Sequence, residues 1–188
     1  MLYPNNIKKV YKKNISHKNR GMDLEKLINE SNEYYLNNDI AVIYKKPTPI
    51  GITKVIYHEN KMKIKDAYFE SKSTLDYNGL FKGKYIDFDA KVTENKTSFP
   101  LSNVHPHQIE HMKRVIHHGG ICFLIIKMNS NYYLLDGKIF LDFIINNKRK
   151  SIPFDFIEKN CQRIKEGYNP PLDYLKVVKE VYFKESVK

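Results

Sequence analysis

Apolar and polar residues alternate strictly along residues 85–91, Tyr-Ile-Asp-Phe-Asp-Ala-Lys. Successive side chains on a strand take opposite faces, so this period of two predicts a strand with one apolar and one polar face. The polar face carries Asp87, Asp89 and Lys91. We therefore expect Asp89 and Lys91 to stand side by side.

The rest of the chain predicts a mixed sheet flanked by helices. Stretches with helical periodicity alternate with short apolar runs, and glycine or proline separates several of them. Helices are predicted at residues 23–37, 106–118, 154–165 and 172–183, buried strands at 39–45 and 121–128, a turn into a further apolar run at 132–136, and an amphipathic stretch at 138–146. The order helix, strand, hairpin, strand, helix, strand is typical of an α/β (α+β) domain.

Residues 53–58 and 63–69 predict a β-hairpin joined by residues 59–62. Both strands have few apolar residues and many lysines, so we expect the hairpin to project from the body. The lysine- and asparagine-rich residues 1–19 show little periodicity and predict a loose basic arm. Residues 20–188 then form a single domain.

The net charge of the chain implies a binding partner. The formal net charge of +11 over 188 residues indicates an anionic partner, with nucleic acid the first candidate and an anionic membrane surface the second. Lysine far exceeds arginine, and asparagine and isoleucine are abundant, which is also typical of an AT-rich genome and weakens the inference.

Three further features bear on where the protein works. No apolar run approaches the roughly eighteen residues that span a membrane, and residues 1–18 are basic and polar rather than signal-like. Cys122 and Cys161 are isolated, so we expect both to be reduced packing residues. A cytoplasmic protein without a membrane partner is the expectation.

Candidate chemistry centres on Asp76, Asp89 and Lys91. Gly79 and Gly83 lie between the two aspartates and would let the chain fold back, bringing Asp76 to the polar face of the 85–91 strand. Two carboxylates suit Mg²⁺, and an adjacent lysine could orient a water and offset charge on a phosphate. The alternative is a solvated strand face, because Asp-x-Lys occurs by chance in many proteins.

Eight sequence blocks stand out in order along residues 19–182: Asn19–Met22, Ile40–Ile43, Lys45–Pro49, Ala67–Phe69, Asp76–Gly79, Tyr85–Phe88, Lys96–Leu101 and His107–Met112. In these blocks the chain resembles the RecU-type Holliday junction resolvases, which are dimeric enzymes on the PD-(D/E)xK nuclease fold. The resemblance implies a restriction-endonuclease-like mixed sheet and a homodimer. It also implies Mg²⁺-dependent, symmetric cutting of four-way DNA junctions during recombination and repair, with Mn²⁺ as an alternative ion.

The resemblance also implies roles for individual residues. The family's metal-binding positions fall on Thr74, Asp76, Asp89 and Gln108, and its transition-state stabiliser falls on Lys91. Thr74 precedes Asp76 by two residues and so would lie on the same side of a strand. Gln108 would lie in the first turn of its helix and lean over the same face. Glu25 resembles an acidic residue that nucleases of this fold bring near the site, and its alternative is a capping or surface glutamate.

The projecting hairpin, at about residues 47–72, resembles the family's stalk, which enters the opening at the centre of a junction. Its expected DNA contacts are phosphate-binding lysines and Phe69, which could stack on an unpaired base. The alternative is a solvated basic hairpin with Phe69 in the core. The residues predicted to bind DNA are Arg20, Lys45, Lys46, Lys61, Lys63 and Phe69, with Lys54 and Lys65 as further phosphate contacts.

One departure from the family leaves a second function open. The family usually has Glu where this chain has Asp89, so the carboxylate is one methylene shorter and could require Asp87 or an extra water to help hold the metal. A catalytically weakened junction-binding or regulatory protein is therefore an alternative to the resolvase. A sequence-specific restriction enzyme of the same fold is a third possibility, and a recombinase and a branch-migration motor are candidate protein partners of the resolvase.

The histidines around residue 110 offer a competing reading. His107 to His111 fits the H-x-x-E-H order of a zinc site, but no third ligand is evident and the stretch belongs to one of the eight blocks. Phosphate contact or a surface position is the preferred interpretation. The basic run at residues 147–150 could touch the arms of the DNA.

Overall fold

The computed structural model describes residues 17–58, 61–69 and 74–183, with side chains except at 17–22, 58 and 69. The body is built on a six-stranded mixed sheet in which only β5 and β7 are parallel. In order across the sheet, the strands are β1 (Val42–Lys45), β4 (Tyr77–Phe81), β5 (Lys84–Val92), β7 (Ile121–Met128), β8 (Asn131–Asp136) and β10 (Gln162–Ile164). The predicted fold class, a mixed sheet flanked by helices, is confirmed.

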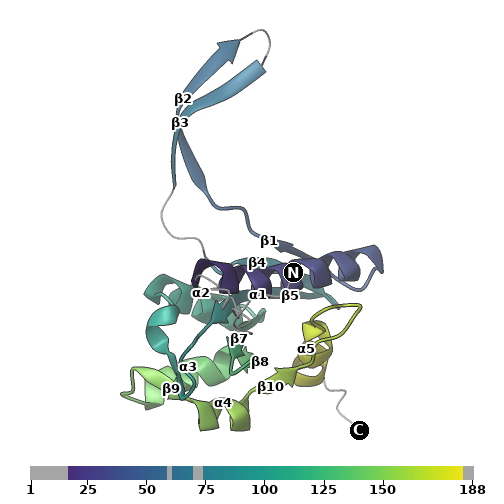
Figure 1. Cartoon of the computed structure of the whole chain (residues 1–188), viewed down its shortest axis with the longest axis vertical. Coiled ribbons are helices and arrows are strands. Elements are labelled where there is room, and N and C mark those ends of the chain that lie inside the picture. The colour runs from purple at the N-terminus through teal and green to yellow at the C-terminus, as the bar shows by residue number, and fades with distance from the viewer. Residues whose placement is uncertain (1–16, 59–60, 70–73, 184–188) are drawn as a thin grey trace, which may run out of the picture.

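Helices cover both faces of the sheet and make two separate cores (Figure 1). On one face α1 (His17–Asn37) and α5 (Tyr174–Tyr182) pack on the apolar side of β5, around Phe88. On the other face lie α2 (Pro106–His117), α3 (Gly137–Asn146) and α4 (Phe154–Asn160). A small sheet of β6 (Ser98–Pro100) and β9 (Ser151–Pro153), with a 3₁₀ turn at Leu101–Asn103, supports this second layer.

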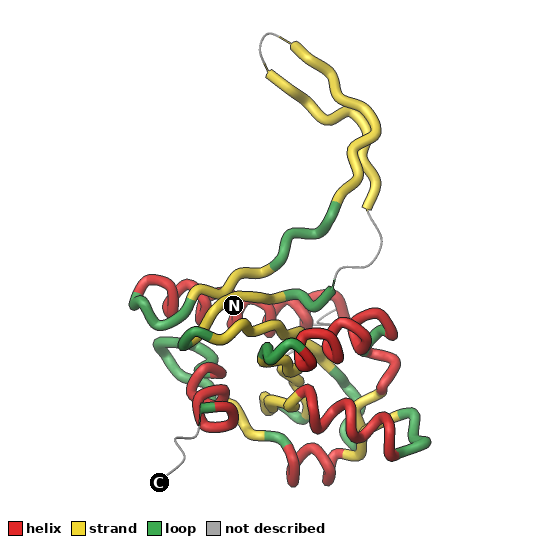
Figure 2. The backbone as a smooth tube through the Cα atoms, turned by 180° about the vertical axis from the view of Figure 1, so that it is seen from behind, coloured by secondary structure: helices red, strands yellow, loops and turns green. Residues whose placement is uncertain are grey.

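The hairpin projects from the body as a separate two-stranded sheet, as Figures 1 and 2 show. It consists of β2 (Ile50–His58) and β3 (Lys61–Phe69), which extend the predicted strands by a few residues. We call β2 and β3 the stalk. The stalk is inserted between β1 and β4, and these two strands pair with each other in the body.

The alternating strand was predicted correctly, and its polar face is buried rather than solvated. β5 covers Lys84–Val92, and Asp87 and Asp89 are fully buried despite lying on its polar face. β5 is an interior strand with β4 and β7 as its neighbours, and α2 lies over the face that carries the carboxylates. A buried carboxylate must find partners, so this face requires an organised polar cluster.

Two element predictions were wrong in part. The predicted helix at 154–165 ends at Asn160, because Gln162–Ile164 pairs with β8 as an edge strand instead. The predicted buried strand at 39–45 is only Val42–Lys45, and it is an edge strand with three of its four side chains exposed. Edge positions have one neighbour only, which a local apolar run cannot reveal.

The two glycines expected to turn the chain serve different purposes. Gly83 lies in the two-residue β4–β5 turn with φ of 73°, where a left-handed residue is needed. Gly79 lies within β4, and a Cβ there would come within 2.0 Å of the carbonyl oxygen of Val42. Gly79 therefore permits the close approach of β1 rather than a turn.

Candidate active site

Asp89 and Lys91 stand side by side on β5, as predicted. Lys91 Nζ lies 2.9 Å from Asp89 Oδ2, and the lysine side chain is 17% exposed. Gln108, in the first turn of α2, donates from Nε2 to the same Oδ2 at 2.5 Å. Its Oε1 accepts from the backbone N–H of His105 at 3.1 Å. The amide thus caps α2 and holds Asp89 at once.

Asp76 faces the same cluster from the segment before β4. Burial, with the neighbouring charge of Asp89, raises the pKa of Asp76 to about 6, and the ammonium groups of Lys91 and Lys45 partly offset this. Two carboxylates that repel each other in a buried site favour either a shared proton or a bound cation. The predicted meeting of Asp76 and Asp89 is therefore found.

Thr74 and Asp76 do not share a strand face, which corrects the sequence prediction. Residues 74–76 precede β4, which begins at Tyr77. The Thr74 hydroxyl accepts from Lys46 Nζ at 2.8 Å, and the Thr74 carbonyl accepts from Gln108 Nε2 at 3.3 Å. Thr74 lies at the site, but its side chain contacts Lys46, the residue directly after β1.

The donors present fit a divalent cation. Asp89 Oδ1 is buried and has no hydrogen-bond partner within the described part of the chain, whereas Oδ2 has two. A buried carboxylate oxygen without a partner is costly unless something else binds it. Together with Asp76 it offers the one or two carboxylates that Mg²⁺ takes in proteins. Gln108 presents its amide nitrogen, rather than its oxygen, to this carboxylate.

Glu25 on α1 lies at the border of the site. Its Oε2 pairs with Lys45 Nζ at 2.5 Å, and both side chains are about two-fifths exposed, at 39% and 41%. Burial raises the pKa of the Tyr77 phenol, and the charges of Glu25, Asp76 and Asp89 raise it further. Glu25 is thus near the carboxylates and pairs with a lysine that also acts on Asp76.

Sequence reasoning gave only a minor role to Asp87, whose carboxylate has the most contacts. Its two oxygens accept from Lys46 Nζ at 3.0 Å each, and Oδ2 also lies 2.9 Å from the Tyr85 hydroxyl and 2.8 Å from His111 Nε2. Asp87 was considered only as a helper for Asp89, although these contacts already occupy it. The alternation that placed it beside Asp89 was the available signal.

The predicted DNA contacts divide into two groups. Lys54, Lys61, Lys63 and Lys65 are exposed on the stalk, available to a ligand. Lys46 is 18% exposed, with its ammonium group on Thr74 and Asp87. The side chains of Arg20 and Phe69 lie outside the described part of the structure.

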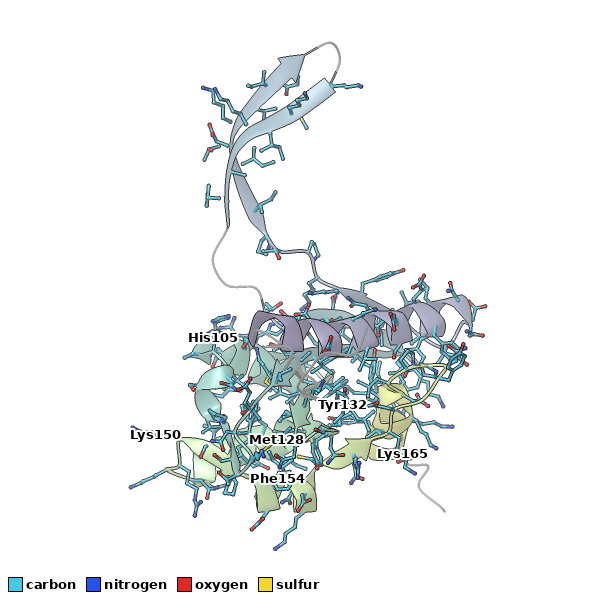
Figure 3. All side chains as sticks on the ribbon, viewed as in Figure 1. His105, Met128, Tyr132, Lys150, Phe154 and Lys165 are labelled. Atoms are coloured by element: carbon cyan, nitrogen blue, oxygen red, sulfur yellow. The ribbon has the colours of Figure 1, made fainter. Side chains whose placement is uncertain are left out.

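The histidines are spread over different contacts. His107 stacks on His105, with ring centroids 5.5 Å apart, whereas His111 turns inward to Asp87. His105 lies near the side of the body from which the stalk projects, and Lys150 lies farther from the stalk (Figure 3). Within the described residues, no three His, Cys, Asp or Glu side chains gather as ligands for a metal ion.

Asp89 and Lys91 on β5, faced by Asp76 from the segment before β4, suit the hydrolysis of phosphodiesters. The fold and site are thus those of a nuclease.

The chain belongs to the RecU family. The family model described as "RecU: Recombination protein U" matches residues 19–180. A protein of Bacillus subtilis (strain 168) named "Holliday junction resolvase RecU" is 51% identical over 175 residues, which cover 91% of this chain and 85% of that protein. A relative of the same name from Geobacillus sp. (strain WCH70) is 52% identical over 171 residues, 88% of this chain and 85% of its own.

Among solved structures, Hjc, described as a Holliday junction resolvase, from Archaeoglobus fulgidus matches with a TM-score of 0.43 and 7% identity. The match covers 76% of this chain and 94% of that one, and the likeness is weak. Separately, none of the helices in the described residues has the length and apolar character needed to cross a membrane.

Proposed function

We propose that this protein is an endonuclease that resolves four-way DNA junctions by symmetric phosphodiester hydrolysis, dependent on Mg²⁺ or Mn²⁺. The observation that carries the proposal is the meeting of Asp76, Asp89 and Lys91 around a buried carboxylate oxygen without a hydrogen-bond partner. The relatives at about half identity, named as junction resolvases, supply the substrate class.

Asp76 and Asp89 would hold the metal ion directly, with Thr74 and Gln108 beside them. A divalent ion bound there supplies Lewis-acid polarisation of a phosphate oxygen and lowers the pKa of a coordinated water. Because Asp89 is one methylene shorter than glutamate, a water would be needed where its carboxylate does not reach the ion.

The chain's own residues orient the reacting groups. Lys91 Nζ, held 2.9 Å from Asp89, can offset negative charge developing on the phosphate and position the attacking water. Gln108 fixes Asp89 Oδ2 and so leaves Oδ1 to face the ligand. Glu25, paired with Lys45, is a further carboxylate at the border of the site.

The stalk supports junction DNA as the substrate. It carries exposed lysines on a projecting hairpin rooted beside the carboxylates, so the parts that meet the DNA and the parts that cut it are adjacent. Lys61 and Lys63 would contact phosphates, and Arg20 and Phe69 are proposed as further DNA contacts. Two cuts at symmetric positions suit a homodimer with two-fold symmetry, acting in the cytoplasm.

A catalytically weakened, junction-binding protein remains the second candidate. The observation that favours it is Asp89, one methylene shorter than the glutamate usual in the family. Such a protein would bind junctions and act with a recombinase or a branch-migration motor without turnover of its own.

The test is cleavage of a labelled four-way junction beside a linear duplex of the same sequence, in Mg²⁺ and in Mn²⁺. Paired symmetric cuts in the junction alone, lost in Asp76→Ala and in Lys91→Ala, are expected. Tight junction binding without cuts in either ion would instead support the weakened protein. Cuts at a defined site in the duplex would indicate a restriction enzyme.

A further inference from the structure

A second buried carboxylate lies behind the proposed metal site. The Asp87 side chain is fully buried, and it accepts hydrogen bonds from Lys46, Tyr85 and His111. Lys46 directly follows β1, Tyr85 lies on β5 and His111 lies on α2. Asp87 therefore joins three separate parts of the body at one point.

Lys46 connects this point to the segment that carries Asp76. Its Nζ contacts Asp87 Oδ1, Asp87 Oδ2 and Thr74 Oγ1 at 3.0, 3.0 and 2.8 Å. Its backbone N–H also donates to the carbonyl of Asp76 at 2.7 Å. One residue thus holds both ends of the Thr74–Asp76 segment.

Lys46 lies at the base of the stalk. It immediately precedes Pro47, where the chain leaves the body towards the stalk, and Thr74 is where the described chain returns from it. Residues 74–76 have no strand pairing of their own, apart from that single backbone bond. Side-chain contacts must therefore fix their position.

The burial of Lys46 argues against a phosphate contact. A lysine that binds DNA needs an accessible ammonium group, but Lys46 is 18% exposed and its ammonium group already has three oxygen partners. Moving it to a phosphate would leave Asp87 buried with its main countercharge removed, which is strongly unfavourable.

We infer that Lys46 and Asp87 are positioning residues that hold Thr74 and Asp76 in place for metal binding at the root of the stalk. The inference rests on the proposed function, because it assigns a supporting layer to the same metal site. Partners of metal ligands are expected to affect metal affinity by about 10- to 100-fold. They act through the ligand and touch neither the ion nor the DNA.

The test separates metal affinity from DNA affinity. Mn²⁺ binding to the DNA-free protein is measured by titration calorimetry, and the half-saturating Mn²⁺ concentration for cleavage is measured alongside. Junction affinity is measured in EDTA. The variants are Lys46→Met, Asp87→Asn and the double variant, with Lys84→Met on exposed β5 surface as the matched loss of a lysine and Lys54→Met on the stalk as the reference for a phosphate contact.

Lys46→Met and Asp87→Asn are each expected to raise the Kd for Mn²⁺ by about 10-fold or more, with junction affinity in EDTA within about twofold of the wild type. Saturating Mn²⁺ should restore most of the cleavage rate. Because the two residues act as a unit, their effects on Mn²⁺ affinity should not add. The Kd of the double variant for Mn²⁺ should exceed that of the weaker-binding single variant by no more than about twofold. Thermal unfolding in EDTA verifies folding, and the isosteric Asp87→Asn carries the test if Lys46→Met does not fold.

Two results would overturn the inference. Unchanged Mn²⁺ affinity in both single variants would remove the positioning role. Weakened junction binding in Lys46→Met with a reduced salt dependence, as expected for Lys54→Met, would make Lys46 a phosphate contact. A wild-type protein that neither binds Mn²⁺ nor cuts junctions would instead overturn the proposed function, so the two failures are distinguishable.

Discussion

Gln108 Nε2 and Asp89 Oδ2 lie 2.5 Å apart, and both side chains are buried. The other end of the amide accepts from His105 N, so its orientation is fixed from two sides. The cap of α2 and a carboxylate of the proposed metal site therefore share one side chain. The site is tied to the start of α2 by this contact and cannot move independently of the helix.

Replacing Gln108 with methionine should cost both stability and metal affinity. The His105 N–H loses its side-chain acceptor and Asp89 loses one of its two donors, for an expected loss of about 1–2 kcal/mol in the free energy of unfolding. Urea unfolding in EDTA measures the first effect, and Mn²⁺ titration measures the second. Gln162→Met, at an exposed position of β10, is the matched control. Equal stability of the two variants would contradict the shared role.

The raised pKa of Asp76 predicts a pH-dependent stability in the metal-free protein. Its pKa is raised from 3.8 to about 6, so the folded state holds the proton more tightly than the unfolded state does. The stability contributed by the protonated carboxyl is full below pH 3.8 and is lost as the pH rises through 6.

Asp76→Asn cannot ionise, so it should unfold at a higher temperature than the wild type at pH 7.5 in EDTA. The difference should shrink towards pH 4. Added Mn²⁺ should raise the unfolding temperature of the wild type but not of the variant. Thermal scans at both pH values test this, and a variant less stable than the wild type at pH 7.5 in EDTA would refute it.

Lengthening Asp89 should change the preference between metal ions. Mg²⁺ requires near-ideal octahedral geometry, so a short carboxylate penalises it. Asp89→Glu should lower the half-saturating concentration of Mg²⁺ for junction cleavage relative to that of Mn²⁺. Paired metal titrations of both proteins give the ratio, with Asp142→Glu on the exposed surface of α3 as control. A ratio that stays the same would show that side-chain length at this position does not limit Mg²⁺ use.

The stalk lysines should set the salt dependence of junction binding. Each phosphate contact contributes about 0.9 to the slope of log affinity against log salt concentration. Lys61→Gln with Lys63→Gln should therefore flatten the slope by about two and weaken binding in EDTA. Lys26→Gln with Lys113→Gln, at exposed positions on α1 and α2, gives the same loss of charge away from the stalk. Equal slopes for the two double variants would mean that the stalk lysines make no phosphate contacts.

Gly79 and Gly83 should respond differently to substitution. Gly79→Ala places a methyl group against the Val42 carbonyl and should cost about 2–3 kcal/mol or more, because β1 must move. Gly83→Asn should be nearly neutral, because asparagine tolerates positive φ in such a turn and no atom lies near a Cβ there. Urea unfolding of both variants measures the contrast.

The local pattern of apolar and polar residues was sufficient to predict β5 and α2. The alternation at residues 85–91 predicted β5 and the neighbouring positions of Asp89 and Lys91, because side-chain direction on a strand depends only on parity. It could not predict that α2 would help to bury Asp87 and Asp89, since that depends on a helix three elements later in the chain. Lys46 read as a surface lysine for the same reason: its partners at positions 74 and 87 are distant in sequence.

Predictions failed mostly at the edges of the sheet. Gln162–Ile164 continues a helical pattern but pairs with β8, because an unfilled sheet edge outweighs weak helix propensity. Thr74 and Asp76 were predicted to share a strand face from their two-residue spacing, yet residues 74–76 precede β4 and are not a strand. The resemblance to a family supplied Thr74 and Gln108, which no local pattern would have singled out.

The insertion of the stalk between β1 and β4 has a consequence for how such an enzyme could change its target. β1 and β4 pair with each other in the body and not with the stalk, so we expect the hairpin to tolerate changes in length without a shift of the sheet register. The exchanged segment would lie between Pro47 and Thr74, next to the residues that Lys46 joins. The stalk, which would recognise the shape of the DNA, could therefore be replaced without changing the residues proposed to cut it.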